Sequence, residues 1–443
     1  MRSKFVSAVA LTLSTLMATC SFAEDWPQWM GPQRDNVWRQ SGLIENLDDA
    51  EVVWRQPIAW GYAGPAVADG TVFINDFVTD ANVKVSNFQR RGFDGTERLT
   101  ALDAATGEEK WTFEYPMTIT ASYPGGPRCT PVVEDGRVYS LGAEGFLACL
   151  NAEDGTKIWS VDLKEQYKVN SPLWGYAAHP LIYKDKLITL AGGEGTHAVA
   201  LDTKTGEELW RTLSSEQQGY APPTLIEHGG ILQLILAKPD EVASVNPDTG
   251  DVYWSVPYQA TNGSIIMSPV LFKDHLFVGG YSQKTMLLKL ISAAEQNDGK
   301  PGATVEWQDK GRAGISPVNV QPIVTDGVMY GFDQNGQLYA VELPSGKRLW
   351  NTPEPVSKRP LGTGSGFIVR QAETDVYWIF TEAGDLTRCR LTKDGFEELS
   401  RTHLLDPTNS AFGRAVVWSQ PAFAGQRVYV RNDKEIMAVD LGE

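Results

Sequence analysis

Residues 101–111 read Ala-Leu-Asp-Ala-Ala-Thr-Gly-Glu-Glu-Lys-Trp, and this pattern recurs along the chain. Further copies, close or looser, occupy residues 149–159, 200–210, 244–254 and 340–350. All five keep a separation of ten residues from the first position to the Trp. A sixth copy, residues 288–307, is lengthened by an insertion, and a seventh, residues 389–399, has Leu399 where the others have Trp. Such regular recurrence predicts a repeat architecture.

Each copy has the features of a tight hairpin. The Asp or Asn side chain can accept hydrogen bonds from the amides of a turn, and the Gly can adopt a positive φ at little cost. The return strand then brings its Trp to a recurring buried position, where a large apolar side chain contributes roughly 1.5–3 kcal/mol. We expect these tryptophans to pack between units: Trp54, Trp111, Trp159, Trp210, Trp254, Trp307 and Trp350.

A second hairpin motif precedes each copy. Its clearest form, residues 131–139, reads Pro-Val-Val-Glu-Asp-Gly-Arg-Val-Tyr, with apolar residues on both sides of an Asp-Gly turn. Related segments begin at Pro65, Pro180, Pro223, Pro269, Pro322 and Pro421. Asp-Gly between short apolar runs is a strong hairpin signal. The two hairpins together predict four antiparallel strands per unit.

The number of units follows from the ends of the chain. Positions 54 and 399 are seven steps apart, so one unit takes about 49 residues, which fits a four-stranded propeller blade. The last unit, residues 418–441, has only three strands, whereas residues 51–55 form a lone Trp-bearing strand. We therefore predict an all-β, eight-bladed β-propeller over residues 51–443, whose N-terminal strand closes the last blade. Residues 24–50 would form an extended arm before it.

The repeat resembles that of a known family. Its pattern, A-x-D-x-x-T-G-x-x-x-W, is similar to the tryptophan-docking repeat of quinoprotein alcohol dehydrogenases and to the PQQ-like (pyrrolo-quinoline quinone) repeats of BamB-type outer-membrane assembly propellers. The resemblance covers nearly all of residues 51–441. Residues 25–35, Asp-Trp-Pro-Gln-Trp-Met-Gly-Pro-Gln-Arg-Asp, look like the lead-in of a bacterial subfamily of PQQ-like propellers. Members often carry Glu-Arg ahead of the repeat, as Glu97-Arg98 stands here. The resemblance implies the fold more strongly than any activity.

The first 23 residues have the features of a signal peptide. Arg2 and Lys4 precede an apolar run over residues 5–18, and Ser-Phe-Ala at 21–23 offers a cleavage site. A membrane span needs about 20 apolar residues, more than this run provides. We expect an exported protein of the periplasm or cell envelope, without a transmembrane segment. A lipid anchor at Cys20 is an alternative that the preceding Met-Ala-Thr matches poorly.

Composition excludes several classes of protein. A hydrophobic content of 42% and 14 Trp exclude wholesale disorder. The formal net charge of −16 disfavours nucleic-acid binding, because phosphates would be repelled. Beyond Cys20 the chain has three cysteines, Cys129, Cys149 and Cys389, and this odd count favours free thiols. We expect a monomer that binds protein partners.

No catalytic motif is found in the sequence. The resemblance to quinoprotein dehydrogenases would imply adjacent cysteines and a Ca²⁺ held by Glu, Asn or Asp, but no two cysteines are adjacent and no such ligands can be assigned. A P-loop, G-x-S-x-G and H-E-x-x-H are absent from the sequence. His179 and His197 fall in one blade, but two histidines alone do not make a metal site. We therefore predict no catalytic residue, metal or cofactor, with PQQ and calcium expected only if the chain is a dehydrogenase.

The better functional candidates precede the inner strands, where each blade approaches the central channel. Their side chains are polar or aromatic, and they either line a water-filled channel or bind a ligand or partner at its mouth. The candidates are Tyr62, Arg128, His179, Tyr220, Ser268, Gln321, Trp418, Ser419 and Gln420. The segment 75–98 also lengthens the first blade, as a functional loop or a disordered insertion.

Three functions are compatible with these features. The leading one is an exported, non-catalytic binding or scaffold propeller related to BamB-type assembly factors. The alternatives are a PQQ-dependent alcohol or sugar dehydrogenase, and a propeller that binds a polysaccharide or a peptide without catalysis.

Overall fold

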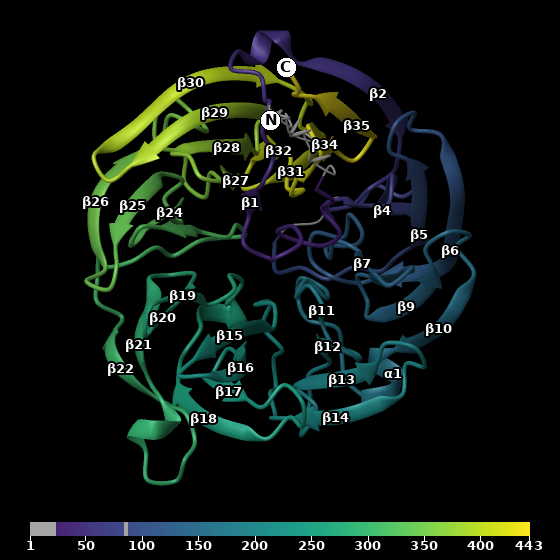
Figure 1. Cartoon of the computed structure of the whole chain (residues 1–443). Coiled ribbons are helices and arrows are strands. Elements are labelled where there is room, and N and C mark those ends of the chain that lie inside the picture. Colours follow the sequence, from purple (N-terminus) through teal and green to yellow (C-terminus); the bar gives the residue numbers. More distant parts are fainter. Residues whose placement is uncertain (1–23, 84–86) are drawn as a thin grey trace, which may run out of the picture.

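Eight antiparallel sheets stand around a central channel in the computed structural model, which describes residues 24–83 and 87–443 (Figure 1). Each blade has four strands, which are consecutive in the sequence except in blade 8, where β2 joins β33, β34 and β35, and blade 7 gains β1 as a fifth. Blade 1 comprises β3 (Ala66–Ala68), β4 (Thr71–Val78), β5 (Phe93–Asp103) and β6 (Glu109–Ile119), and blade 2 comprises β7 (Val132–Glu134), β8 (Arg137–Leu141), β9 (Phe146–Asn151) and β10 (Lys157–Asp162). Blade 3 comprises β11 (Leu181–Tyr183), β12 (Lys186–Leu190), β13 (Ala198–Asp202) and β14 (Glu208–Thr212), and blade 4 comprises β15 (Thr224–His228), β16 (Ile231–Ala237), β17 (Glu241–Val245) and β18 (Val252–Pro257).

The second half of the ring repeats this plan and then returns to the N-terminus. Blade 5 comprises β19 (Val270–Phe272), β20 (His275–Gly280), β21 (Lys284–Ile291) and β22 (Gly302–Gln308), and blade 6 comprises β23 (Ile323–Thr325), β24 (Val328–Phe332), β25 (Leu338–Glu342) and β26 (Lys347–Thr352). Blade 7 comprises β27 (Gly366–Gln371), β28 (Val376–Thr381), β29 (Asp385–Thr392) and β30 (Gly395–His403), with β1 (Val37–Trp38) beside β27. Blade 8 comprises β33 (Ala422–Ala424), β34 (Arg427–Arg431) and β35 (Glu435–Asp440), with β2 (Glu51–Pro57) beside β35. A small hairpin, β31 (Asn409–Ala411) and β32 (Arg414–Val416), lies between blades 7 and 8. The described helices are short: α1 (Leu163–Tyr167) and three 3-10 turns (Leu47–Asp49, Thr261–Gly263 and Ala293–Glu295).

The ring closes as the sequence predicts. The N-terminal strand β2 pairs antiparallel with β35, the last strand of the chain, and Trp54 lies opposite Ala438. Two segments separated by nearly the whole sequence thus share blade 8, and no open edge remains between first and last blades (Figure 1).

The repeated turn and the repeated Trp fit into each other across blade boundaries. In the first copy, the Asp103 carboxylate accepts hydrogen bonds from the amides of Ala105 and Thr106, and Gly107 has φ = 77°. The Trp54 ring of the preceding blade covers that glycine so closely that a Cβ would lie 2.7 Å from it. Its Nε1 donates to the carbonyl of Ala104 at 3.1 Å. Glycine is therefore required both by the turn and by the neighbouring ring.

Six of the seven tryptophans donate to a backbone carbonyl of the next blade's turn. The acceptors for Trp54, Trp111, Trp159, Trp210, Trp307 and Trp350 are Ala104, Ala152, Thr203, Pro247, Pro344 and Thr392. Trp254 instead bonds the Gln233 side chain of its own blade, since the next blade carries the insertion between β21 and β22 in place of this turn.

The eighth docking position is Ser400, so the prediction of Leu399 was wrong by one residue. In the other blades the Trp directly follows the bulged residue, as where Ala101 faces Trp111. In blade 7, Arg388 faces Ser400 and Leu399 is bulged. These strands pair down to a tight turn between Thr392 and Gly395, and that pairing, rather than the sequence spacing, sets the register.

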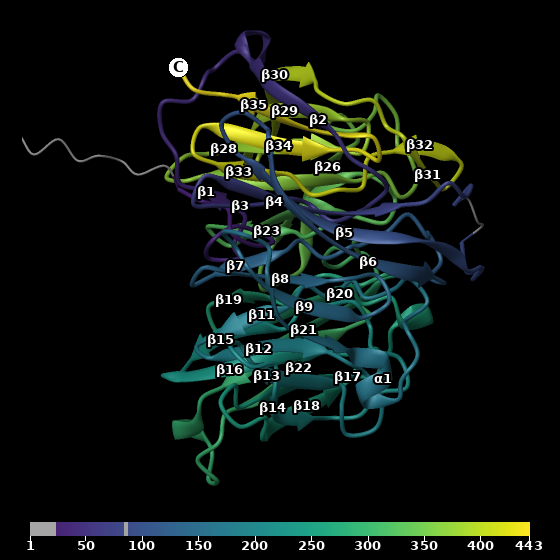
Figure 2. The same ribbon diagram turned by 90° about the vertical axis from the view of Figure 1, so that its right-hand side faces the viewer.

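The N-terminal arm covers the position that lacks a Trp. Ser400 Oγ accepts the amide of Leu47 at 2.8 Å, and Leu47 is almost fully buried. Upstream, Trp26 pairs with Val67 of blade 1, and β1 pairs in parallel with β27. Figure 2 places β1 on one face of the ring and the β31–β32 hairpin on the opposite face. The arm thus lies across one end of the channel and leaves the other end to the loops.

Candidate functional site

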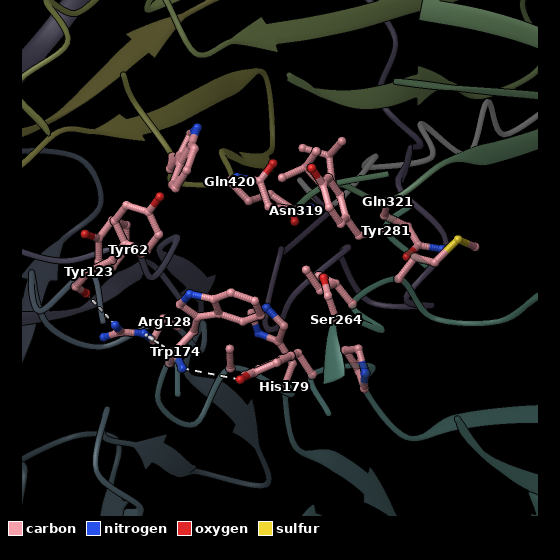
Figure 3. Close-up of a pocket in the computed structure, with 18 of the residues that line it drawn as sticks. Tyr62, Tyr123, Arg128, Trp174, His179, Ser264, Tyr281, Asn319, Gln321 and Gln420 are labelled. Atoms are coloured by element: carbon pink, nitrogen blue, oxygen red, sulfur yellow. Dashed lines mark hydrogen bonds between the residues drawn. The ribbon is translucent and has the colours of Figure 1, made fainter. Parts of the chain in front are cut away.

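A cavity of about 340 Å³ occupies the central channel. Seven of the nine predicted candidates line it: Tyr62, Arg128, His179, Tyr220, Gln321, Trp418 and Gln420. Tyr62 and Tyr123 lie on one side of the pocket, and Tyr281 and Gln321 lie on the other (Figure 3). The lining comes from the N-terminal arm and from the loops that precede or join the inner strands of most blades.

Two predicted candidates, Ser268 and Ser419, do not line the cavity. The Ser268 amide donates to the Gln321 side chain, which donates back to the Ser268 carbonyl. Ser419 Oγ donates to the carbonyl of Ala63 at 3.0 Å. Both serines are buried and connect neighbouring blades instead of facing the channel.

The floor of the cavity is made by the arm and blade 3. The Trp29 indole stacks on the His179 imidazole, with ring centroids 4.6 Å apart and planes within 5° of parallel. Arg34 lies over the same indole at 5.3 Å and donates to the carbonyl of Pro180 at 2.8 Å. The arm therefore closes the channel at this end.

His179 is held in one chemical state. Its Nδ1 accepts the backbone amide of Thr130 at 3.1 Å. Desolvation, reinforced by the positive charge of Arg34, lowers the pKa of His179 well below its usual value. Because an amide N–H only donates, the ring proton of the neutral imidazole is on Nε2.

Arg128 has a supporting role in the wall. Its guanidinium donates to the carbonyls of Trp174 (2.7 Å), Ser122 (3.1 Å), Tyr123 and Gly126. It also lies over the Tyr62 ring at 5.1 Å. Burial lowers the pKa of Arg128, and no described carboxylate forms an ion pair with it. With four donors committed to backbone carbonyls, Arg128 fixes two loops rather than offering a free anion site.

The wall nearest the mouth includes the long insertion of blade 1. Asn87 accepts the Trp174 indole N–H at 2.9 Å, and Phe88 packs on the Trp174 ring at 5.6 Å. Its described part, residues 75–83 and 87–98, forms long strands and a side of the site, so it is not a wholly disordered insertion. Across the pocket, Trp418 packs against Tyr123 and Phe412.

Three aromatic side chains at the mouth remain open to solvent. Phe88 is 54% exposed, Phe412 45% and Tyr281 37%. They belong to blade 1, to the β31–β32 hairpin and to blade 5, and all three line the cavity. Phe88 belongs to the segment 75–98, which the sequence analysis singled out as a possible functional loop. Tyr281, Phe412, Trp29, Tyr123, Trp174 and Asn319 were not predicted, because they come from loops and from the arm. For these, the quoted lead-in that contains Trp29 was the available signal.

The cavity does not fit the calcium–quinone pair of quinoprotein dehydrogenases. Its lining, as described, includes no carboxylate and no cysteine, so a divalent cation would find no anionic ligand. Nearby Glu97 already accepts the Tyr115 hydroxyl and the Ala143 amide. Cys129 is buried with its sulfur 3.6 Å from the Tyr176 carbonyl. No group of three or more His, Cys, Asp or Glu side chains able to hold a metal occurs in residues 24–83 and 87–443.

Comparisons with known proteins agree with this fold. Residues 95–352 match the family described as "Outer membrane protein assembly factor BamB". BamB of Salmonella typhimurium is 28% identical over 253 residues, which is 54% of this chain and 58% of the relative. BamB of Escherichia coli (strain K12) gives the same values. The chain thus spans little more than half the length of these relatives. BamB of Shewanella oneidensis is 21% identical over 77% of this chain and 91% of its own.

Solved structures show the same architecture. BamB from Moraxella catarrhalis superposes with a TM-score of 0.55 and 14% identity, covering 88% of this chain and 99% of that one. Quinohemoprotein alcohol dehydrogenase from Comamonas testosteroni gives 0.58 and 14%, covering 94% and 80%. Both similarities concern the fold alone. Within the part of the chain described here, no helix is of a length and hydropathy suited to crossing a bilayer. Because the matched segment covers more than half of the sequence, the chain belongs to the BamB family of PQQ-like β-propellers.

Proposed function

We propose that the chain is a non-catalytic binding propeller of the cell envelope, which docks a partner protein on the face that carries the cavity mouth. The observation that carries the proposal is the ring of exposed aromatic side chains, Phe88, Tyr281 and Phe412, on three separate parts of the propeller. Exposed aromatic clusters at a concave site are typical of interaction surfaces, and aromatic residues are enriched among binding hot spots.

The opposite end of the channel does not offer such a surface. In the part of the chain that the structure describes, the arm covers that end, and its Trp26 and Trp38 are almost fully buried against Phe423 of blade 8. The signal-peptide features of residues 1–23, which lie outside the described residues, support export. The relatives are named as assembly factors for outer-membrane proteins, which supports a role alongside other envelope proteins.

Site-specific photo-crosslinking tests the proposal. A benzophenone amino acid is placed at position 412 in one variant and at position 158 in a matched control, because Phe412 and Ile158 are both 45% exposed but Ile158 lies on β10. In intact cells, we expect discrete protein adducts from position 412 and none from position 158.

A second variant tests whether the adduct depends on the rim. Phe88→Ser removes another exposed aromatic side chain of the rim and leaves position 412 unchanged, and we expect it to reduce the adduct yield severalfold. Equal yields from positions 412 and 158, or the absence of adducts at 412, would refute docking at the mouth.

A further inference from the structure

The floor of the cavity, below the aromatic rim, has a different chemical character. His179 presents its Nε2–H as a neutral donor, because Nδ1 is occupied by the Thr130 amide and the ring is held flat against Trp29. Within the described chain this Nε2 has no hydrogen-bond partner, and the residue lines the cavity (Figure 3). A donor held in one tautomer and one orientation is pre-organised for an acceptor on a ligand.

Amide side chains line the same cavity as this donor. Asn319 lines the cavity, and its Oδ1 is buried without a hydrogen-bond partner among the described residues. An unpaired buried acceptor is unfavourable, and a hydroxyl of a bound ligand would satisfy it. Gln420 also faces the cavity and is held there by the bond from its amide nitrogen to Asn36 Oδ1 at 3.0 Å.

Charge selects against ionic ligands. The described lining has no carboxylate to attract an ammonium group. Arg128, its one guanidinium, already donates to four backbone carbonyls and has little left for an anion. The remaining polar groups are amides, hydroxyls and a neutral imidazole, so they suit a ligand rich in neutral donors and acceptors.

The walls supply flat apolar faces. Trp174 and Tyr220 pack together at 5.3 Å on one side, and Trp418 and Tyr123 at 5.5 Å on another. A pyranose ring offers C–H groups on its faces and hydroxyls around its edge, a combination that matches aromatic walls above a neutral polar floor. The cavity volume, about 340 Å³, lies at the lower end of the roughly 300–1,000 Å³ of small-molecule sites.

We propose that the cavity is a binding site for a neutral saccharide of one or two pyranose rings, with a sugar oxygen accepting the Nε2–H of His179 and a hydroxyl donating to Asn319 Oδ1. The site goes beyond the protein docking proposed for the rim, because it uses residues of the floor and of the arm. The ligand could equally be a free sugar or the end of a longer glycan, which shares the same terminal rings.

Calorimetric titration of the full mature chain tests the proposal. The probes are four neutral disaccharides, namely maltose, cellobiose, lactose and N,N′-diacetylchitobiose, together with gluconate as an anionic sugar acid and a neutral hexapeptide, Gly-Ser-Trp-Ser-Gly-Gly with blocked ends. We expect 1:1 binding of at least one disaccharide, and binding of gluconate at least tenfold weaker.

Two cavity variants and one matched control locate the binding. His179→Asn keeps an acceptor for the Thr130 amide but cannot reach the position of Nε2, and Asn319→Leu removes the unpaired acceptor. Each should weaken the disaccharide at least tenfold while the melting temperature shows that the fold persists. His228→Asn, the same substitution on β15 outside the cavity, should leave binding unchanged.

Several results would overturn the proposal. They are the absence of binding by all four disaccharides at millimolar concentration, saccharide binding that survives both cavity variants, and tighter binding of gluconate. Binding of the hexapeptide in place of any saccharide, lost in His179→Asn, would assign the cavity to a peptide. A longer glycan that binds more tightly than its disaccharide would identify a glycan end as the source. None of these results affects the crosslink at position 412, so the rim and the floor are tested separately.

Discussion

Replacing Trp54 by Ala tests how the ring is closed. The Trp54 side chain is 8% exposed, covers Gly107 of blade 1 and donates to the Ala104 carbonyl at 3.1 Å. Truncation of a buried aromatic side chain costs about 3–5 kcal/mol, because both the apolar contact and the filled volume are lost. We expect Trp54→Ala to lower the free energy of unfolding by that amount.

The expected change in melting temperature is small because the chain is long. Unfolding entropy near 60 °C is about 2.1 cal/mol/K per residue, so for a chain of this length about 3–5 kcal/mol corresponds to a fall of roughly 3–6 °C if unfolding is cooperative. Denaturant titration gives the free energy directly. Val52→Ala is the matched control, since Val52 lies on the same strand and is 46% exposed. A Trp54→Ala protein as stable as this control would refute the docking argument.

Four further predictions follow from the described residues. Deleting residues 24–56 removes β2 and the arm, which exposes the edge of β35 and opens the cavity floor, so light scattering should detect aggregation; an unchanged melting curve would contradict closure through β2. Thiol titration of a denatured, unreduced chain that lacks residues 1–23 should count three groups, because the structure contains Cys129, Cys149 and Cys389 as free buried thiols, and burial raises the pKa of the first two to about 12; a count of one would indicate a bridge. Adding PQQ and Ca²⁺ should produce no dye reduction with ethanol or glucose, because the described cavity lining has no anionic ligand, and turnover that requires both additions would restore the dehydrogenase hypothesis. Hydrogen bonds that the His403 ring donates to Asp385 and Asp406 raise the pKa of His403, so its stabilisation is complete below its unfolded pKa of about 6.5 and is lost as the pH rises through the raised folded pKa; His403→Gln should flatten this part of the stability profile, and an unaltered profile would exclude His403 as its source.

The blades could be predicted from sequence because their determinants are local. The fixed spacing of Asp or Asn, Gly and Trp specifies both a turn and the Trp ring that packs on the turn of the next blade. Asp103, Gly107 and Trp54 interact as that spacing implies. The prediction failed at Ser400, where a tight hairpin sets the register. The spacing of residues along the chain does not determine which of two possible turns a hairpin adopts. The sequence therefore could not show that the docking position is Ser400 and not Leu399.

The site could be predicted only in part, for a different reason. Residues before the inner strands inherit their position from the repeat, and seven of nine candidates line the cavity. The other lining residues come from segments without a repeat pattern, such as Phe412 in the β31–β32 hairpin and Trp29 in the arm. Their placement depends on contacts across the ring, for example the stack of Trp29 on His179.

The pairing of β2 with β35 has a consequence for the order of folding. β2 is among the first strands to be synthesised, but its partner is the last strand, so β2 has no pairing edge until residues 435–440 emerge. Blades 1 to 7 can form from neighbouring segments as the chain lengthens, whereas closing this loop carries the largest entropic cost of any strand pair in the ring. A chain that contains both strands but has not yet closed its ring therefore presents two complementary free edges, β2 and β35, and the edges of two such chains can pair with each other. The final step of folding is thus also the step most open to exchange between molecules, and it should respond to protein concentration during refolding.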